Sequence, residues 1–378
     1  MSECGLGDTP LTAGILEAAI REAFPELADL RLLQVTSVSK LGKGQGFLSH
    51  ILRLELSWKG ASEKVPRSLV AKIPYIDALE AVLSAYPESP HKQAITGRLP
   101  QLHASECAIL EAFRKEAPGF PLPECYGSQC MDEAGFGFLL LEDLTENGLI
   151  LPHEQRITLA QAEALWDALA HFQAYSLHHS ELREFFANKA DFIADFAELG
   201  RQNHEDCLHI LAEMRPTYFQ GREEKRMRVT ADLVNAMADK IWKELGLPDV
   251  LLHGDLHNAN FIFHKQLPDR LLALIDWQAL HLGPAVEDLS RILLLMNTED
   301  RRQHQDRLLE RYIHIVAPHA QGRLTLEKLS EAMRLWWPVQ VNQFAEICAT
   351  FLNASPFRHQ PEMQENILAL LRDAFDDI

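Results

Sequence analysis

The strongest constraint on the fold of this chain is a change in its hydrophobic pattern near residue 145. Before that point the apolar segments are short, and in 52–58 Leu and Trp alternate with Arg, Glu and Ser, as in a half-buried strand. After it, longer segments with helical spacing dominate, and 157–179 is the clearest of them. The pattern predicts an α+β protein with a small lobe at 1–145 and a larger, mainly helical lobe at 146–378.

The predicted small lobe contains a hairpin and two helices. The strand at 52–58 turns through a polar segment into a second strand at 68–74, which stops at a proline and carries a lone lysine, Lys72. Helical spacing of apolar residues predicts helices at 11–30 and 102–116. The hairpin therefore places one cation on a strand of a small, largely antiparallel sheet.

Composition excludes several classes of protein. Hydrophobic residues make up 47% of the 378 residues and charged residues 24%, so the chain can bury a core and is not generally disordered. Asp and Glu number 54 against 36 Lys and Arg, and the resulting charge of −18 repels nucleic acids and anionic membranes. The first ten residues lack the cationic and apolar regions of a secretory signal, so we expect a cytoplasmic protein without a membrane span.

The cysteines predict neither a disulfide framework nor a structural zinc site. One Cys-x₄-Cys pair has no second pair at zinc-site spacing. Isolated cysteines of this kind are usually small buried apolar residues or inert thiols. The six cysteines are Cys4, Cys107, Cys125, Cys130, Cys207 and Cys348.

The residues most suggestive of chemistry follow two apolar runs in the helical lobe. The run VLL leads into His-Gly-Asp-Leu-His-Asn-Ala-Asn at 253–260, and LLALI leads into Asp276. Both runs look like buried strands, whose rigid ends can hold a site. Asp255, Asn260 and Asp276 supply hard oxygen atoms, which suit Mg²⁺ better than zinc or copper.

Such a set of residues suits phosphoryl transfer, which needs charge neutralisation and alignment more than covalent chemistry. In this interpretation Asp255 is the catalytic residue that accepts or orients the acceptor hydroxyl, while Asn260 and Asp276 bind one or two Mg²⁺ ions. Lys72 binds the α- and β-phosphates of the nucleotide, and Glu106 holds the Lys72 ammonium. Backbone N–H groups of the glycine turn, which contains Gly42, Gly44 and Gly46, cover the phosphates.

Together these motifs resemble the aminoglycoside phosphotransferase and choline kinase superfamily, and most closely its ecdysteroid-kinase-like (CHK-kinase-like) branch. The resemblance covers most of the chain, with its supporting segments at 69–74, 103–113, 138–144, 168–174 and 283–293. It implies a bilobal protein-kinase-like fold, with a small antiparallel-sheet lobe and with ATP as cofactor in the cleft. Residues 141–144 would then form a hinge that binds adenine through backbone groups, so the cofactor-binding residues include Glu142 and Leu144, with Ser49 beside the glycine turn.

Departures from protein kinases favour a small-molecule acceptor. Gly254 stands where those kinases have arginine, and Trp277-Gln278 follows the metal aspartate, with a short path into the next helix. The sequence thus lacks evident machinery for docking a peptide. The acidic charge favours a cationic amino-alcohol or aminoglycoside-like acceptor, whereas the branch favours a bulky, steroid-like alcohol, and the sequence leaves both open.

Alternatives remain at several positions. Lys40 or Lys43 could replace Lys72, and Glu106 could be a plain surface charge. His253 and His257 are expected to hold the loop through hydrogen bonds rather than to bind metal, and Asp288 is expected to brace it. The chain could also be a catalytically silent pseudokinase or scaffold. A metallophosphoesterase is a further alternative, but the additional Asp-x-His and Gly-Asn-His motifs of that fold are missing.

Overall fold

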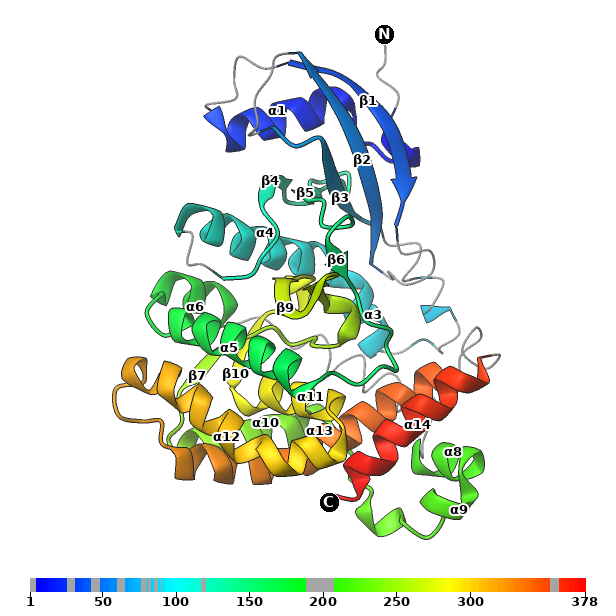
Figure 1. Ribbon diagram of the computed structural model, residues 1–378, viewed down its shortest axis with the longest axis vertical. Coiled ribbons are helices and arrows are strands. Elements are labelled where there is room, and N and C mark those ends of the chain that lie inside the picture. The colour runs from blue at the N-terminus through cyan, green and yellow to red at the C-terminus, as the bar shows by residue number, and fades with distance from the viewer. Residues whose placement is uncertain are drawn as a thin grey trace. The chain divides into compact units, whose positions relative to one another are not determined.

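In the computed structural model, most of the chain is described. The described residues are 5–25, 31–41, 48–59, 65–75, 80, 83–84, 88, 90–116, 120–187, 207–353 and 360–378. The chain forms two compact units (Figure 1). The first contains Met1–Gly148 and Ala273–Gln278, and the second contains Leu149–Leu272 and Ala279–Ile378. The short segment that carries Asp276 therefore groups with the N-terminal part of the chain.

The first unit is built on a five-stranded sheet in the order β1-β2-β3-β5-β4, with every neighbouring pair antiparallel. The predicted strands at 52–58 and 68–74 are both present, and Ile51 pairs with Lys72 across them. Alternate residues of the predicted strand at 52–58 are buried, as its sequence pattern indicates. The strands are β1 (Arg31–Lys40), β2 (Ser49–Lys59), β3 (Ser68–Pro74), β4 (Cys125–Gln129) and β5 (Phe138–Glu142).

Helices accompany this sheet. The helix expected at 11–30 is shorter, because the structure has α1 at Ala13–Ala23, where the Thr12 side chain accepts from Ile15 N at 3.3 Å. Pro25 explains the early end, since proline cannot continue a helix. Residues 26–30 lie outside the described residues. The predicted helix at 102–116 is present as the longer α4 (Leu99–Glu116); η1 (Leu6–Asp8) and α3 (Pro90–Gly97) complete the helices described in this unit.

The second unit is mainly helical, as predicted from the hydrophobic pattern. Its helices are α5 (Leu159–Ser176), α6 (Ser180–Phe186), α8 (Cys207–Met214), α9 (Pro216–Phe219), η3 (Glu223–Lys225), α10 (Ala231–Lys243), η4 (Asn258–Asn260), α11 (Val286–Leu295), α12 (Thr298–Val316), η6 (Ala317–His319), α13 (Leu326–Asn353) and α14 (Pro361–Phe375). The α+β class expected from the sequence is confirmed, with an antiparallel sheet in one unit and predominantly helices in the other.

Short strands frame the candidate loop in the second unit. β7 (Asp249–Leu252) pairs antiparallel with β10 (His281–Pro284), and β8 (Phe261–His264) is the sheet neighbour of β9 (Leu267–Leu274). β6 (Gly148–Leu149) and η5 (Trp277–Ala279) lie where the chain passes from one unit to the other. The loop with Asp255 thus leaves a buried strand, as the apolar run before it predicts.

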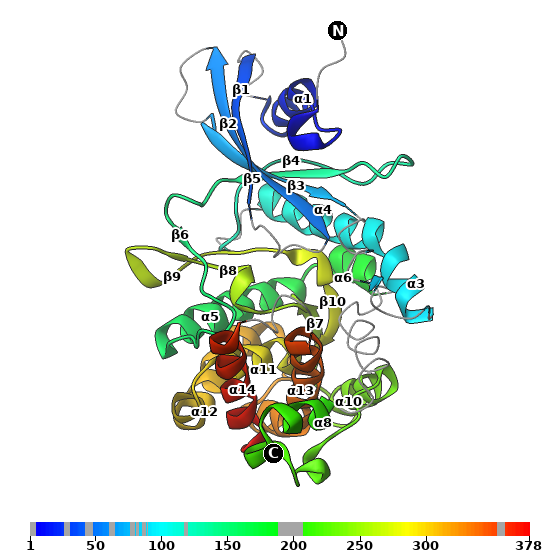
Figure 2. The same ribbon diagram turned by 90° about the vertical axis from the view of Figure 1, so that its right-hand side faces the viewer.

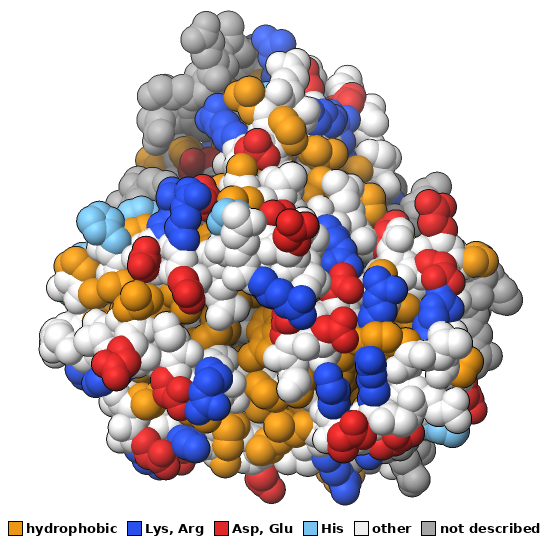
Figure 3. All heavy atoms as spheres, turned by 60° about the horizontal axis from the view of Figure 1, so that its bottom comes forward, with side chains coloured by type: hydrophobic (Ala, Val, Ile, Leu, Met, Phe, Trp, Pro, Cys, Tyr) orange, Lys and Arg blue, Asp and Glu red, His pale blue; other side chains and the backbone are white. Residues whose placement is uncertain are grey.

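The core of the second unit contains α11, all of whose residues are buried. Buried charges on this helix include Glu287, Asp288 and Arg291, so the helix carries more than apolar packing. On the face shown in Figure 3, acidic and basic side chains are interspersed with apolar patches. None of the helices in the described parts of the chain has the length and apolar character needed to cross a bilayer.

Thr158→Ala tests the local origin of α5. The Thr158 side chain accepts from Gln161 N at 3.2 Å, and the Gln161 side chain accepts from Thr158 N at 3.0 Å, which forms a capping box. Removing the hydroxyl is expected to lower the free energy of unfolding by about 1 kcal/mol. Urea denaturation followed by circular dichroism measures this change. Thr158→Ser keeps the oxygen and serves as the control, and an equal loss in both variants would contradict the capping explanation.

Candidate functional site

Lys72 is held by two carboxylates within the first unit. Its Nζ lies 2.6 Å from Glu106 Oε2 and 2.5 Å from Asp276 Oδ1, although the three residues come from distant parts of the sequence. Lys72 is only 8% exposed. Burial lowers the pKa of the Lys72 ammonium, but Asp276 and Glu106 outweigh this and raise the pKa above its ordinary value. The lysine therefore stays charged.

Glu106 is not a plain surface charge. It is buried on α4, and its second oxygen, Oε1, accepts from Trp277 N at 3.3 Å. Burial raises the pKa of Glu106, which the Lys72 ammonium opposes. Of the competing lysines, Lys40 is exposed on β1 and lies 3.8 Å from Asp8, whereas Lys43 is outside the described residues. The structure thus joins Lys72, rather than Lys40, to Glu106.

Asp276 occupies an unusual backbone conformation at the end of β9. Its φ of 68° is in the left-handed region, which aspartate tolerates better than most residues with a Cβ. The next residue, Trp277, is anchored because its Nε1 donates to Leu274 O at 3.0 Å and its ring meets Phe120 edge-on at 5.4 Å. These contacts fix the turn that directs the Asp276 carboxylate to Lys72.

A second set of residues belongs to the loop after β7, in the second unit. The N–H groups of His253 and Gly254 donate to the two oxygens of Asp288, at 2.8 and 3.0 Å. Gly254 has a φ of 81°, and a Cβ there would lie 2.4 Å from Ala279 O. No side chain fits this position, which explains glycine here in physical terms. The expected bracing role of Asp288 is confirmed.

The hydrogen bonds around Asp288, here called the brace, continue into α5 and α12. Burial raises the pKa of Asp288 to about 6, while the hydrogen bonds from Gly254 and His253 favour its ionised form. Gln173 on α5 donates to Asp288 Oδ2 at 3.3 Å, and Tyr312 on α12 donates to Gln173 Oε1 at 2.6 Å. Neither Gln173 nor Tyr312 stands out in the sequence, and the only signal is that Gln173 lies in the helix motif at 168–174.

Asp255 is ionised at neutral pH. Burial would raise the pKa of this carboxyl, but the imidazole of His257 together with nearby Arg291 and His253 lowers it to about 2. His257 Nε2 lies 3.5 Å from Asp255 Oδ2. His253 Nδ1 accepts from Asp255 N, and His257 Nδ1 accepts from Ala259 N, each at 3.3 Å. Both histidines therefore hold the loop, as expected.

Asn260 is bound into the same loop through its amide nitrogen. Its Nδ2 donates to Asp255 O at 2.8 Å, so the side-chain oxygen is the atom suited to a cation. An amide oxygen from Asn260 and a carboxylate from Asp276 fit the ligand preference of Mg²⁺. Within the residues that the structure describes, no three His, Cys, Asp or Glu side chains form a group that could hold a metal ion. The metal-binding roles stay predictions.

The remaining predicted nucleotide-binding residues are placed only in part. Gly42, Gly44 and Gly46 lie outside the described residues, while Ser49 is the first residue of β2. At the predicted hinge, Glu142 N donates to Glu124 O at 2.8 Å, and Leu144 O accepts from Gly148 N at 2.7 Å. These backbone groups have partners within the unit, and adenine binding at 141–144 stays a prediction.

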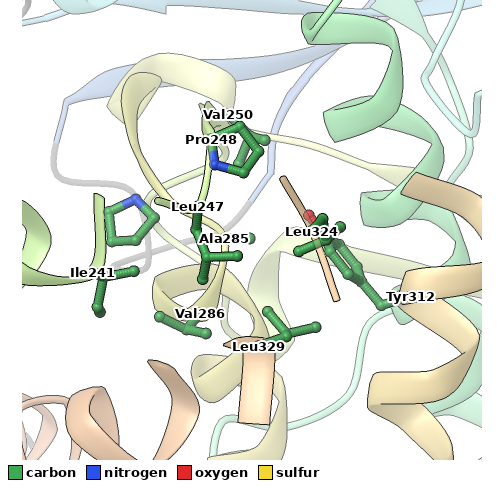
Figure 4. A pocket seen from close by; sticks show the side chains of 10 residues that line it. Ile241, Leu247, Pro248, Val250, Ala285, Val286, Tyr312, Leu324 and Leu329 are labelled. Atoms are coloured by element: carbon green, nitrogen blue, oxygen red, sulfur yellow. The ribbon is translucent and has the colours of Figure 1, made fainter. Parts of the chain in front are cut away.

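The second unit contains a small apolar cavity (Figure 4). Tyr312 joins it to the brace described above, because its hydroxyl is hydrogen-bonded to Gln173. The cavity lining comes from the segment around α10 and β7, the start of α11, and the region of α12 and α13. The lining residues are Ile241, Leu247, Pro248, Val250, Pro284, Ala285, Val286, Tyr312, Leu324 and Leu329.

A family model described as "Uncharacterized oxidoreductase dhs-27" matches residues 4–378 of this chain. The Caenorhabditis elegans protein "Uncharacterized oxidoreductase dhs-27" is 26% identical over 81% of this chain and 37% of that protein. A second protein of that organism, "Uncharacterized kinase-like protein D1044.1", is 27% identical over 72% of this chain and 71% of that protein. The chain thus spans little more than a third of the first relative's length.

Among solved structures, the chain is similar to the GDP complex of wild-type aminoglycoside 2'-phosphotransferase-IIIa, with 14% identity over 95% of this chain and 97% of that one. The TM-score of this match is 0.48. Assignment to the ecdysteroid-kinase-like branch stays a prediction. Because the family model covers nearly the whole sequence, the chain belongs to the family described as "Uncharacterized oxidoreductase dhs-27".

Proposed function

We propose that this chain is an ATP- and Mg²⁺-dependent phosphotransferase that moves the γ-phosphate to a hydroxyl group of a small molecule. The observation that carries the proposal is the buried Lys72 ammonium with Glu106 on one side and Asp276 on the other. A surface lysine would not need two carboxylates, and a buried one is costly unless it is paired. Kinase chemistry uses such a positioned cation to bind nucleotide phosphates.

Each member of the Lys72 cluster (Lys72, Glu106 and Asp276) has a distinct part in this proposal. Glu106 fixes the ammonium, and its bond to Trp277 N ties this pair to the turn of Asp276. The Lys72 ammonium binds phosphate oxygens as a point charge. Asp276, whose side chain keeps 29% exposure, would hold the metal when it is bound. When bound, Mg²⁺ supplies neutralisation of the charge on the phosphates.

The loop after β7 supplies the acceptor-side residues. Asn260 would contribute its amide oxygen to the metal, and Asp255 would accept a hydrogen bond from the acceptor hydroxyl. With its pKa lowered to about 2, Asp255 is a hydrogen-bond acceptor throughout the neutral range but a weak base. That combination suits a loose phosphoryl-transfer transition state, in which the hydroxyl is oriented first and loses its proton late. The brace from Asp288 keeps the loop backbone rigid meanwhile.

Other functions are less well supported. A catalytically silent scaffold would have no use for an ionised Asp255 together with the Lys72 cluster. The word "oxidoreductase" in the family description is part of the name of a relative that is much longer than this chain. Dinucleotide-binding oxidoreductases use a parallel sheet with a phosphate-binding turn, whereas the described strand pairs of the first unit here are antiparallel. Within the proposal, the acceptor is either a bulky neutral alcohol or a cationic amino-alcohol.

Asp276→Asn is expected to abolish most of the stabilisation that MgATP gives. If the nucleotide binds the native state, saturating MgATP raises the melting temperature, and at 100 times Kd this corresponds to about 2.7 kcal/mol. The variant loses the carboxylate that is proposed to hold the metal, so the shift shrinks while the protein remains folded. Thermal-shift assays with and without MgATP measure this. Asp306→Asn, on an exposed part of α12, is the matched control, and no MgATP shift in the parent protein would overturn the proposal.

Asp255→Asn separates catalysis from nucleotide binding. A panel of alcohols, amino sugars and sterols is screened for ADP release, and the active acceptor is then used with the variant. We expect kcat to fall by about 100-fold or more, because asparagine cannot take the hydroxyl proton, while the MgATP thermal shift remains. Turnover at the parent rate would remove Asp255 from the catalytic role.

A further inference from the structure

The segment that runs from β6 to α5 (Figure 2) contains a turn at 152–155, closed by a hydrogen bond from Gln155 N to Pro152 O at 3.0 Å. Asn258, in the loop after β7, holds this turn. Its Nδ2 donates to the carbonyl oxygens of Pro152 and Gln155, at 2.6 Å each, and lies 3.4 Å from that of His153. One side-chain amide therefore ties together two segments that are distant in the sequence.

The Asn258 amide has one orientation that satisfies these contacts. The side chain is fully buried, with 0% exposure. Carbonyl oxygens only accept hydrogen bonds, so the amide nitrogen must face the turn, because the amide oxygen would repel three acceptors there. Within the part of the chain that the structure describes, Asn258 Oδ1 has no hydrogen-bond partner. The contribution of this side chain to the hydrogen-bond network is thus its donor group.

The far end of the turn is anchored to α11. Ile157 N donates to Leu295 O at 3.0 Å, and Arg156 Nη1 donates to Met296 O at 3.3 Å. Leu295 is the last residue of α11, the helix that carries Asp288. The loop after β7 is therefore attached to α11 twice, directly through the brace and indirectly through Asn258 and the turn.

The turn also places an imidazole beside the catalytic loop. The ring of His153 lies 5.3 Å from the ring of His257, centre to centre, and His257 Nε2 lies 3.5 Å from Asp255 Oδ2. Burial lowers the pKa of His153 and His257 lowers it further, which outweighs the opposite effect of Glu154 and Asp255. His153 is therefore neutral at neutral pH, so it packs on His257 without adding a charge near Asp255.

From this geometry we propose that Asn258 is a positioning residue for Asp255. Asn258 holds the turn at 152–155. The turn keeps His153 against His257, and that contact keeps the His257 imidazole beside the Asp255 carboxylate. The inference rests on the proposed phosphotransferase function, in which Asp255 must meet the acceptor hydroxyl in a fixed geometry.

Asn258→Ala tests the first step, from the amide to the turn. Pro152 and Gln155 are exposed residues, so water can hydrate the turn once the donor is lost, and we expect a loosened turn in a folded protein. The released His153 ring gains solvent, so its pKa should rise toward the ordinary value for histidine. NMR titration of the histidine rings measures this in the full chain, with the His153 signal identified by its loss in His153→Phe.

Kinetics test the second step, from the turn to Asp255. With an acceptor found by screening for ADP release, kcat of Asn258→Ala should fall by about 10- to 100-fold, since small misplacements of a catalytic group are costly. The KM for ATP and the MgATP thermal shift should stay at the parent values. Asn258→Asp keeps the side-chain shape but loses the donor, so its kcat should fall as well. Asn235→Ala, on an exposed part of α10, is the matched control and should change neither kcat nor the pKa of His153.

A pair of variants at His153 tests the same contact without disturbing the buried amide. His153 is only partly buried, so the protein should remain folded when it is changed. His153→Phe keeps a ring against His257 and should retain most of kcat. His153→Ala removes the ring and should lower kcat while the MgATP thermal shift remains. Equal rates in these two variants would overturn the proposal, because the ring contact would then not position Asp255.

Two results at Asn258 would also overturn it. One is an unchanged pKa of His153 in Asn258→Ala, since the amide would then not hold the turn. The other is a raised pKa of His153 together with the parent kcat, since the turn would then not position Asp255. A parent protein without phosphotransferase activity overturns the proposed function and the positioning role with it, whereas an active parent with unaffected variants overturns the positioning role alone.

Discussion

A charged lysine in the interior is the constraint around which the first unit is organised. An ammonium that is removed from water must be paired, and Lys72 is paired by Glu106 from a helix and by Asp276 from a turn about two hundred residues later in the chain. That requirement fixes the face of α4 that meets the sheet, and it ties 273–278 to this unit although most of the surrounding sequence belongs to the other. Asp276 reaches its position only through a left-handed backbone conformation, stabilised by the anchored Trp277.

The second unit also has buried polar groups that need partners, and here the groups are backbone N–H groups of a loop. A loop that presents Asp255 has backbone N–H groups that would be left without partners in the core, and Asp288 satisfies those of His253 and Gly254. Because Asp288 is itself buried, its pKa rises to about 6, and the hydrogen bonds that it receives are what favour its ionised form. Gln173 and Tyr312 extend this network across α5 and α12. The rigidity of the loop therefore comes from three helices as well as from the strand before it.

Much of this architecture could be predicted from local sequence. The alternation in 52–58 and the apolar run ahead of Lys72 predict two strands, because the period of a strand is visible within a few residues. The helix at 157–179 is present but begins at Leu159, where the capping box of Thr158 and Gln161 starts it. The helix at 11–30 was predicted too long, since apolar spacing continues past a proline that the backbone cannot accommodate. The candidate residues Asp255, Asn260 and Asp276 stand out because polar residues directly after buried strands have few purely structural uses.

The sequence by itself determined the α+β class, the strands and helices, and the side chains capable of phosphoryl-transfer chemistry, since all of these depend on residues that are neighbours along the chain. Only the tertiary structure decided that Glu106 is buried beside Lys72 rather than exposed and that Asp288 braces two backbone N–H groups. Each of these depends on contacts between residues far apart in sequence, and their energies depend on burial. The charges along a helix do not show which of its faces will be buried. Burial is what holds an ordinary ion pair in a fixed position.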